Sequence, residues 1–283
     1  MKLLAETAIV LFSAYTNAVA SLTPTPAPAP IPVSSPAPSP PAAAAGLYVA
    51  LGDSITYGEG ASDACQPWTD VVRFPGPCVG TSFVARVGDG LAARANAPVD
   101  VLDLGIGGAR IGDVAARELP RVPADATAIT LDVGTNDSRA IAENVFYTRD
   151  RDYFGQVRAF GRAYDAALAA IRTRAPQAKI VLIDFPNQRY LNDTSVPPVS
   201  DQRPQLAAIY DAASRALARV ILAHRSHALV VDVACDARSY ARPFRASTVH
   251  PNDAGYAIVA THVLEALATE RGTTVTHCPP YLD

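Results

Sequence analysis

From residue 46 onward, short apolar runs alternate with longer stretches in which apolar residues recur at helical spacing. Five of the short runs are rich in Val, Ile and Leu and carry few polar residues, which is typical of strands buried on both faces. These predicted strands span residues 47–51, 99–104, 128–133, 179–185 and 228–233. The stretches between them predict helices near residues 82–95, 112–119, 155–174, 205–225 and 253–269. This alternation predicts an α/β fold, a three-layer α/β/α sandwich with a five-stranded parallel sheet.

The first 45 residues follow a different pattern. Residues 1–20 begin with Lys2, continue with an apolar stretch at 7–15 and end on Ala18-Val19-Ala20, which together predict a secretory signal peptide. The apolar stretch is shorter than the roughly 20 residues that a membrane-spanning helix needs, so we expect no stable membrane span. Residues 21–45 are almost entirely Pro, Ala, Ser and Thr and predict an extended linker, either a tether or a loosely constrained spacer. The folded domain is expected at residues 46–283.

The four cysteines fit an exported protein that is secreted or held in the cell envelope. Cys65 and Cys78 flank a loop rich in Pro and Gly, Cys235 follows the last predicted strand, and Cys278 lies near the end of the chain. Of the three possible pairings we favour 65–78 with 235–278, because the first closes a loop with little regular structure and the second ties the tail to the core. The close Cys-x-x-Cys or Cys/His spacing of a zinc site is absent, so we expect no metal.

Composition and charge narrow the function further. Hydrophobic residues make up 49% of the chain and charged residues 18%, which excludes a chain that is disordered throughout. The net charge is −3 and no block of Lys or Arg stands out, so we expect no nucleic-acid partner. A flavodoxin-like nucleotide binder would share the architecture, but the phosphate-binding pattern Gly-x-x-x-x-Gly-Lys-Ser/Thr is absent.

Residues suited to catalysis gather after the predicted strands. In parallel α/β sheets, ligands bind in the crevice beyond the carboxyl ends of the strands. Three motifs follow the first three strands and a fourth precedes the last helix, namely Gly52-Asp53-Ser54-Ile55-Thr56, Gly105-Ile106-Gly107-Gly108, Gly134-Thr135-Asn136-Asp137 and His250-Pro251-Asn252. We therefore expect all four motifs to meet in one crevice.

In this order the four motifs resemble those of the GDSL-type SGNH hydrolases, and the resemblance covers residues 47 to about 269. It implies a flavodoxin-like SGNH hydrolase fold and serine esterase or lipase chemistry without a cofactor. By the same resemblance Ser54 is the nucleophile and His250 is the general base. The oxyanion hole would combine the N–H groups of Ser54 and Gly108 with the side-chain amide of Asn136, although the glycine run offers three candidates for the middle donor. Taken alone, Ser54 and Asn136 would each suit a helix cap.

One position departs from the family pattern. The family places an aspartate three residues before the histidine, and Ser247 occupies that position here. Three interpretations stay open for what orients His250. The main-chain carbonyl or the hydroxyl near Ser247 holds the imidazole, a remote carboxylate such as Asp232 holds it, or it is held poorly. We favour the first interpretation, which makes the site a Ser–His dyad.

Four other aspartates are given structural roles. Asp53 and Asp137 adjoin the site and are expected to support its loops. Asp103 stands where the family often has Asn and is expected to affect loop hydrogen bonding. Asp253 is interpreted as the N-cap of the last helix.

The sequence as a whole predicts an exported serine esterase that hydrolyses carboxylic esters, either acyl-lipids or acetylated carbohydrates, through an acyl-enzyme on Ser54. The expected partner is a small-molecule, glycan or lipid ester, and the protein is expected to be a monomer. The alternative is a catalytically decayed surface-binding module with the same fold, which the missing aspartate favours. The presence of Ser54, Gly108, Asn136 and His250 in register argues against that alternative.

Overall fold

The computed structural model describes most of the expected domain. The described residues are 44–63, 73–74, 80–148, 152–184, 204–233, 244–246 and 250–269 of the 283. The predicted signal peptide, all but the last two residues of the predicted linker, and both predicted disulfides lie outside them. Ser247 also lies outside the described residues.

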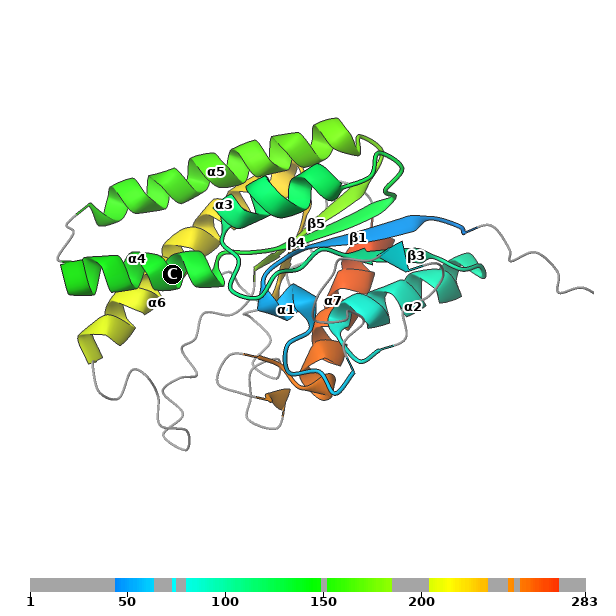
Figure 1. Cartoon of the computed structure of the whole chain (residues 1–283), viewed down its shortest axis with the longest axis horizontal. Helices are drawn as coiled ribbons and strands as arrows, with labels where there is room; N and C mark the ends of the chain where they lie inside the picture. Colours follow the sequence, from blue (N-terminus) through cyan, green and yellow to red (C-terminus); the bar gives the residue numbers. More distant parts are fainter. Residues whose placement is uncertain are drawn as a thin grey trace, which may run out of the picture. The chain divides into compact units, whose positions relative to one another are not determined.

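A single sheet forms the centre of the domain (Figure 1). Its order is β2-β3-β1-β4-β5-β6. Five of the strands pair in parallel, and they are β1 (Leu47–Gly52), β3 (Asp100–Asp103), β4 (Ala128–Asp132), β5 (Lys179–Asp184) and β6 (Leu229–Asp232). These confirm the predicted five-stranded parallel sheet. The two-residue strand β2 (Arg73–Phe74) was not predicted and pairs antiparallel with β3 at the edge.

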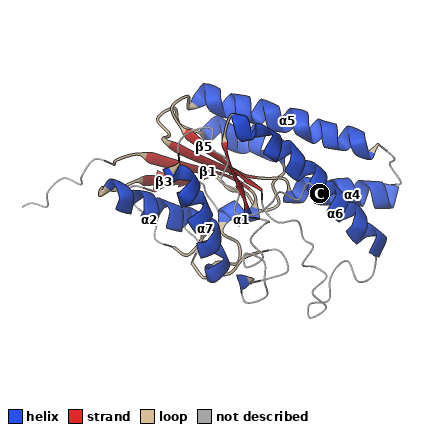
Figure 2. Ribbon diagram, turned by 180° about the vertical axis from the view of Figure 1, so that it is seen from behind, coloured by secondary structure: helices blue, strands red, loops and turns tan. Residues whose placement is uncertain are grey.

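Helices cover both faces of the sheet, as the three-layer prediction requires (Figure 2). Alternate residues of β1 face opposite layers. Val49 and Leu51 pack in a core cluster with side chains of α5 (Tyr153–Arg174) and α6 (Pro204–Ala223). Tyr48 and Ala50 pack in a second cluster with side chains of α2 (Phe83–Ala95) and α7 (Asp253–Ala268). Each large apolar side chain buried in this way contributes about 1.5–3 kcal/mol.

Three helical segments differ from the sequence-based prediction. The single helix expected near residues 112–119 is divided into α3 (Ile111–Asp113), a π-helical turn at Val114–Glu118 and a 3-10 turn at Leu119–Arg121, where Pro120 lies in the first turn. Two further helices were not predicted at all, the short α1 (Ser54–Tyr57) and α4 (Thr135–Glu143), which continues into a π-helical turn at Asn144–Thr148. Both begin inside the glycine-containing motifs that follow β1 and β4.

The strand order determines where a site can form. Strand β1 pairs with β3 on one side and with β4 on the other, so the chain changes its winding direction at β1. Ligands of open α/β sheets bind at such a switch point, outside the carboxyl ends of the strands. Among the described helices, none is long and apolar enough to cross a membrane.

Candidate active site

Ser54 and His250 meet at the carboxyl edge of the sheet, although 196 positions separate them in the chain. His250 Nε2 lies 2.9 Å from Ser54 Oγ, which is hydrogen-bonding distance. Ser54 is the first residue of α1, directly after β1, and His250 lies just before α7. The Ser54 hydroxyl donates to Nε2 when that nitrogen carries no proton, which is the arrangement that general-base catalysis needs.

A tight turn between β1 and α1 places the Ser54 hydroxyl. Gly52 has a φ of 150°, and a Cβ at this position would collide with the main-chain oxygen of Asp132. Asp53 follows as the N-cap of α1, where its Oδ1 accepts the Ile55 N–H at 2.9 Å. The alternative interpretation of Ser54 as the helix cap is therefore wrong, and its hydroxyl is directed to His250.

The segment that carries His250 forms part of a short antiparallel pairing. Ala246 N–H donates to the His250 carbonyl, and Asn252 N–H donates to the Phe244 carbonyl, both at 3.0 Å. An isolated bridge between Arg245 and Pro251 lies between these bonds. These contacts hold the main chain of residues 250–252 against that of residues 244–246.

The N-cap of α7 differs from the prediction. Asn252, rather than Asp253, caps the helix, because the Asn252 side chain accepts the N–H groups of Ala254 and Gly255 at 3.1 Å each. Asp253 is the first residue of the helix, and its carboxylate accepts the N–H and hydroxyl of Ser62 at 2.8 and 2.6 Å. Asp253 thus joins the start of α7 to the loop that follows α1.

Asn136 lies beside the Ser54 turn. Its Nδ2 donates to Asp53 Oδ2 at 3.2 Å and to the main-chain oxygen of Ala109 at 3.1 Å, so it connects the turns after β1 and β3. Gly134 is the N-cap of α4, so the interpretation of Asn136 as a helix cap is wrong. Gly108 lies in the turn just before Ala109, which brings all three predicted oxyanion donors to this edge of the sheet.

The aspartates expected to support the loops do so. Asp137 accepts the N–H of Ile111 with its two carboxylate oxygens at 3.1 and 3.4 Å. Asp103 Oδ1 accepts the Gly105 N–H at 2.9 Å. Together with the Asp53 cap of α1, these bonds shape the turns after β1, β3 and β4.

The GDSL-like lipase/acylhydrolase family model matches residues 50–258, which span all four motifs. The chain belongs to this family. It is therefore a hydrolase, and its α/β fold agrees with that assignment.

Several solved structures are similar in fold to this GDSL-like hydrolase. Phospholipase A1 from Streptomyces albidoflavus NA297 is 22% identical, with 79% of this chain and 98% of that chain covered and a TM-score of 0.51. An acetylxylan esterase from Geobacillus stearothermophilus is 18% identical, with coverages of 80% and 96% and a TM-score of 0.51. An extracellular lipase from Streptomyces rimosus is 21% identical, with coverages of 80% and 100% and a TM-score of 0.53. At these identities the likeness shows the fold alone. Among curated proteins, none matches the chain.

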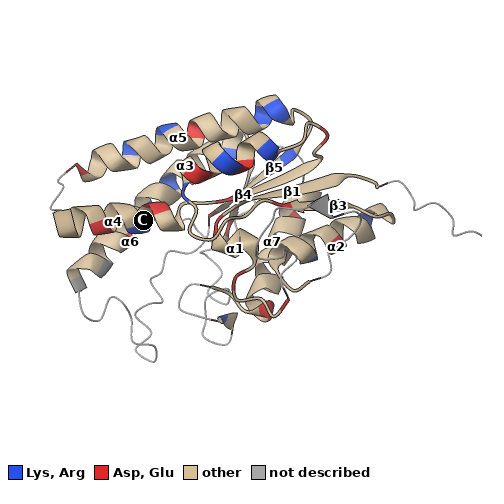
Figure 3. Cartoon of the chain, in the orientation of Figure 1, with Lys and Arg blue, Asp and Glu red and all other residues tan. Residues whose placement is uncertain are grey.

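Several buried acidic residues lie at the carboxyl ends of the strands of this GDSL-like hydrolase. Figure 3 colours the acidic positions of the chain red. Burial is the main cause that raises their pKa values. The pKa rises to about 7 for Asp53, to about 8 for Asp103 and to about 9 for Glu118, and it lies well above the usual range for Asp132 and Asp184. Most of these carboxyls are therefore protonated at neutral pH and can be buried without a cation beside each one.

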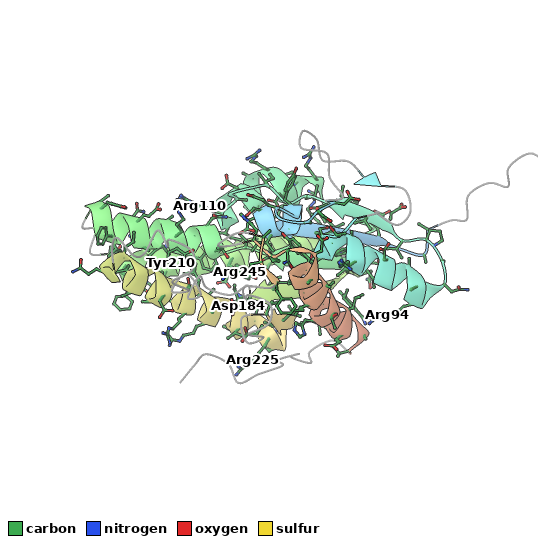
Figure 4. All side chains as sticks on the ribbon, turned by 90° about the horizontal axis from the view of Figure 1, so that it is seen from below. Arg94, Arg110, Asp184, Tyr210, Arg225 and Arg245 are labelled. Atoms are coloured by element: carbon green, nitrogen blue, oxygen red, sulfur yellow. The ribbon has the colours of Figure 1, made fainter. Side chains whose placement is uncertain are left out.

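Asp232, the displaced acid considered from the sequence, lies in this buried layer at the end of β6. It pairs in register with Asp184 of β5, and its charge adds to the burial that raises the pKa of Asp184. Figure 4 views the molecule from below and shows Asp184 near its middle, with Arg94 and Arg225 at the periphery. The role of Asp232 toward His250 stays a prediction, as does that of Ser247.

Two acidic residues of the site escaped the sequence analysis. Glu118 accepts the Gly52 N–H with Oε2 at 2.8 Å, directly beneath the Ser54 turn. Glu59 Oε2 lies 3.4 Å from His250 Nε2. Burial lowers the pKa of His250, and the charge of Glu59 acts in the opposite direction. Neither glutamate stands in a recognisable motif, although Glu59 follows Ser54 by five residues and lies between two glycines.

No group of three or more His, Cys, Asp or Glu side chains within the described ranges is arranged to hold a metal ion.

Proposed function

We propose that this chain is an exported serine esterase that hydrolyses carboxylic esters through an acyl-enzyme on Ser54, with His250 as the general base. The observation that carries the proposal is the 2.9 Å contact between Ser54 Oγ and His250 Nε2 at the switch point of the sheet. Membership of the GDSL-like lipase/acylhydrolase family supports the reaction class. The signal-peptide pattern and the Pro/Ala-rich linker support export.

The reaction proceeds in two transfers. Ser54 Oγ forms a bond to the ester carbonyl carbon while its proton passes to His250 Nε2. The carbon–oxygen bond to the alcohol then breaks, and the alcohol leaves with the proton from Nε2. Water repeats the sequence on the acyl-enzyme, gives its proton to Nε2 and releases the acid and the Ser54 hydroxyl.

The oxyanion that forms in each transfer needs donors placed in advance. In the proposal these are the N–H groups of Ser54 and Gly108 and the Nδ2 amide of Asn136. Asn136 Nδ2 lies between the turns after β1 and β3, where its two protons are directed to Asp53 and Ala109. Because the amide has only these two protons, one of the two bonds is exchanged for the bond to the oxyanion when substrate reacts. Such a donor is typically worth about 2.7–4 kcal/mol in the transition state.

His250 needs a partner that keeps the imidazole aligned. A Ser–His dyad, in which the main chain near Ser247 accepts the Nδ1 proton, is the preferred arrangement, and Asp232 is the displaced acid in the alternative. The lowered pKa of His250 supports the role of a base, because the imidazole is then neutral and able to accept a proton at neutral pH.

The substrate class is an acyl-lipid or an acetylated carbohydrate. Both classes are acted on by proteins of this fold, as the names phospholipase A1 and acetylxylan esterase state. A catalytically decayed binding module is the second candidate, favoured by the absence of aspartate at position 247.

Hydrolysis of p-nitrophenyl esters with acyl chains of two to twelve carbons, by the full chain and its Ser54→Ala variant, tests the proposal. We expect activity that Ser54→Ala abolishes, and the preferred chain length then separates an acetyl pocket from a lipid pocket. Ser226→Ala, which changes an exposed serine in the turn after α6, is the matched control and should retain activity. Equal activity of Ser54→Ala and the unchanged protein would overturn the serine mechanism, and inactivity on every ester would favour the binding module.

A further inference from the structure

The main chain of Glu59 is held in a defined place beside the catalytic pair. Its N–H donates to the Ser54 carbonyl at 2.9 Å, and its carbonyl accepts the Tyr256 hydroxyl at 2.7 Å. The first bond ties Glu59 to the helical turn that begins with Ser54. The second ties it to α7, the helix that directly follows the His250 loop.

The residue after Glu59 packs against the His250 loop. Gly60 has a φ of 95°, and a Cβ at this position would lie 2.5 Å from the Pro251 carbonyl oxygen and 3.0 Å from His250 Cβ. Such an approach is open to glycine alone. The loop after α1 and the His250 loop thus form one packed unit, and the location of Glu59 follows from that packing.

The side chain of Glu59 reaches the nitrogen that faces the nucleophile. Its Oε2 lies 3.4 Å from His250 Nε2, with 46% of the Glu59 side chain exposed and 15% of the His250 side chain exposed. An orienting acid of a catalytic triad binds the other ring nitrogen, Nδ1. Glu59 therefore does not replace the missing aspartate. Its carboxylate lies where Nε2 hands its proton to the departing alcohol.

We propose that Glu59 sets the leaving-group specificity of the site, favouring esters whose alcohol carries a positive charge close to the ester oxygen, such as quaternary ammonium alcohols. The proposal rests on the proposed esterase function of Ser54 and His250. A half-exposed carboxylate attracts such a cation over a few ångströms, and solvent weakens the attraction without removing it. A preference of about fivefold to tenfold in kcat/KM is expected from a charge pair of this kind. Anionic alcohols are disfavoured for the same reason.

The test compares two esters that differ in charge and share one shape. The choline ester and the 3,3-dimethylbutyl ester of the same acid are given to the full chain, with the acyl length that it hydrolyses best. We expect the unchanged protein to favour the choline ester by about fivefold to tenfold, and Glu59→Gln to bring the ratio close to one. The change in the ratio should come from a lower kcat/KM of Glu59→Gln for the choline ester. Added salt should reduce the ratio in the unchanged protein and leave it unaltered in Glu59→Gln.

Control variants separate this proposal from a structural effect. Glu143→Gln makes the same chemical change at a half-exposed glutamate of α4 that pairs with Arg139, and it should keep the ratio of the unchanged protein. Glu59→Ala removes the charge in a second way and should give the same ratio as Glu59→Gln. A fall in the rates on both esters by an equal factor would indicate a structural role and overturn the proposal.

The failure of this proposal differs from the failure of the esterase assignment. If Ser54→Ala is inactive and the choline preference is absent or persists in Glu59→Gln, the specificity role is overturned and the serine mechanism stands. If Ser54→Ala keeps full activity, the serine mechanism is overturned and the role of Glu59 falls with it.

Discussion

The carboxyl group of Glu118 accepts the main-chain N–H of Gly52 at 2.8 Å, although 66 positions separate the two residues. The bond joins the π-helical turn at Val114–Glu118 to the end of β1, two residues before Ser54. Burial raises the pKa of Glu118 to about 9, so the group is protonated at neutral pH and accepts the bond as a neutral acid. A buried acid thus supports the turn that carries Ser54.

This contact predicts different outcomes for two substitutions. Glu118→Gln keeps a neutral oxygen acceptor of similar size, so the free energy of unfolding at pH 7 should change by less than about 1 kcal/mol. Glu118→Ala leaves the Gly52 N–H unpaired and opens a void, which should cost about 2–4 kcal/mol. Urea unfolding at pH 7 measures both values. Glu143→Ala, at an exposed ion pair, is the control and should cost no more than about 1 kcal/mol. Equal losses for Glu118→Gln and Glu118→Ala would contradict the neutral-acceptor role.

The buried carboxyls also predict how stability depends on pH. Their folded-state pKa values are raised to about 7, 8 and 9 for Asp53, Asp103 and Glu118, whereas unfolded carboxyls titrate near 4. At pH values between these limits the folded chain binds more protons than the unfolded chain, so stability falls as pH rises. Urea midpoints at pH 5, 7 and 9 should therefore decrease in that order. Glu118→Gln should flatten the upper part of the decrease, and a midpoint that rises from pH 5 to 9 would refute the prediction.

Much of the fold was predictable from sequence because buried strands leave a strong local signal. The runs at β1, β4 and β5 are mostly apolar, and their observed limits agree with the predicted ones within one residue. Helix α4 was missed because it begins inside the Gly134-Thr135-Asn136 motif and carries few apolar residues. The helix expected at 112–119 contains a π-helical turn, and Pro120, which has no N–H to donate, lies in the 3-10 turn that ends it.

The site was predictable in part for a related reason. Ser54 and His250 stand in motifs at the ends of elements, so their meeting followed from the strand order. Glu59 contacts His250 and Glu118 contacts Gly52, and in both cases the partner lies far away in the chain. A single acidic residue leaves no periodic pattern in the sequence, so neither contact could be predicted. Asn252 and Asp253 are neighbours whose side chains could each cap α7. The conformation of the chain before the helix decides which of them reaches the free N–H groups of the first turn, and the sequence does not reveal it.

Titration of His250 should appear in the pH dependence of catalysis. Burial holds the pKa of its imidazole below the ordinary value of about 6.5, so the acidic limb of kcat/KM should lie below that pH. Glu59 faces the ring from the loop after α1 and opposes this shift, whereas Asp253 at the start of α7 is bound to Ser62. Glu59→Gln should accordingly move the limb to still lower pH. Initial rates between pH 4 and 8 measure both curves, and a limb above pH 7 in the unchanged protein would be incompatible with the buried base.

The amide of Asn136 should matter more for rate than for binding. Asn136→Ala removes a proposed oxyanion donor, so kcat should fall by about 100-fold to 1000-fold with little change in KM. Steady-state kinetics on the preferred ester measure the effect. Asn144→Ala, at an exposed asparagine in the π-helical turn after α4, is the matched control and should keep full activity. A loss confined to KM would remove Asn136 from the oxyanion hole.

Two substitutions decide what orients the imidazole. Ser247→Ala should leave substantial activity, because the main-chain carbonyl of the dyad survives the change. A collapse as deep as that of His250→Ala, for which we expect a loss of about 100-fold to 10,000-fold in kcat, would eliminate the carbonyl interpretation. Asp232→Asn should retain full activity in the dyad, and a large loss in that variant would instead support the displaced acid. Melting temperatures of both variants show whether a loss comes from unfolding.

The separation of Ser54 and His250 along the chain also bears on when the catalytic pair can form. A polypeptide emerges from the ribosome with its N-terminus first, so β1 and the Ser54 turn are complete long before the segment that holds His250 has been synthesised. Contact between the two side chains requires β6 to join the sheet and α7 to pack against β5 and β6. A chain interrupted anywhere before residue 250 therefore carries the hydroxyl without its base. The proposed catalytic pair can therefore form only after nearly the whole domain has been synthesised.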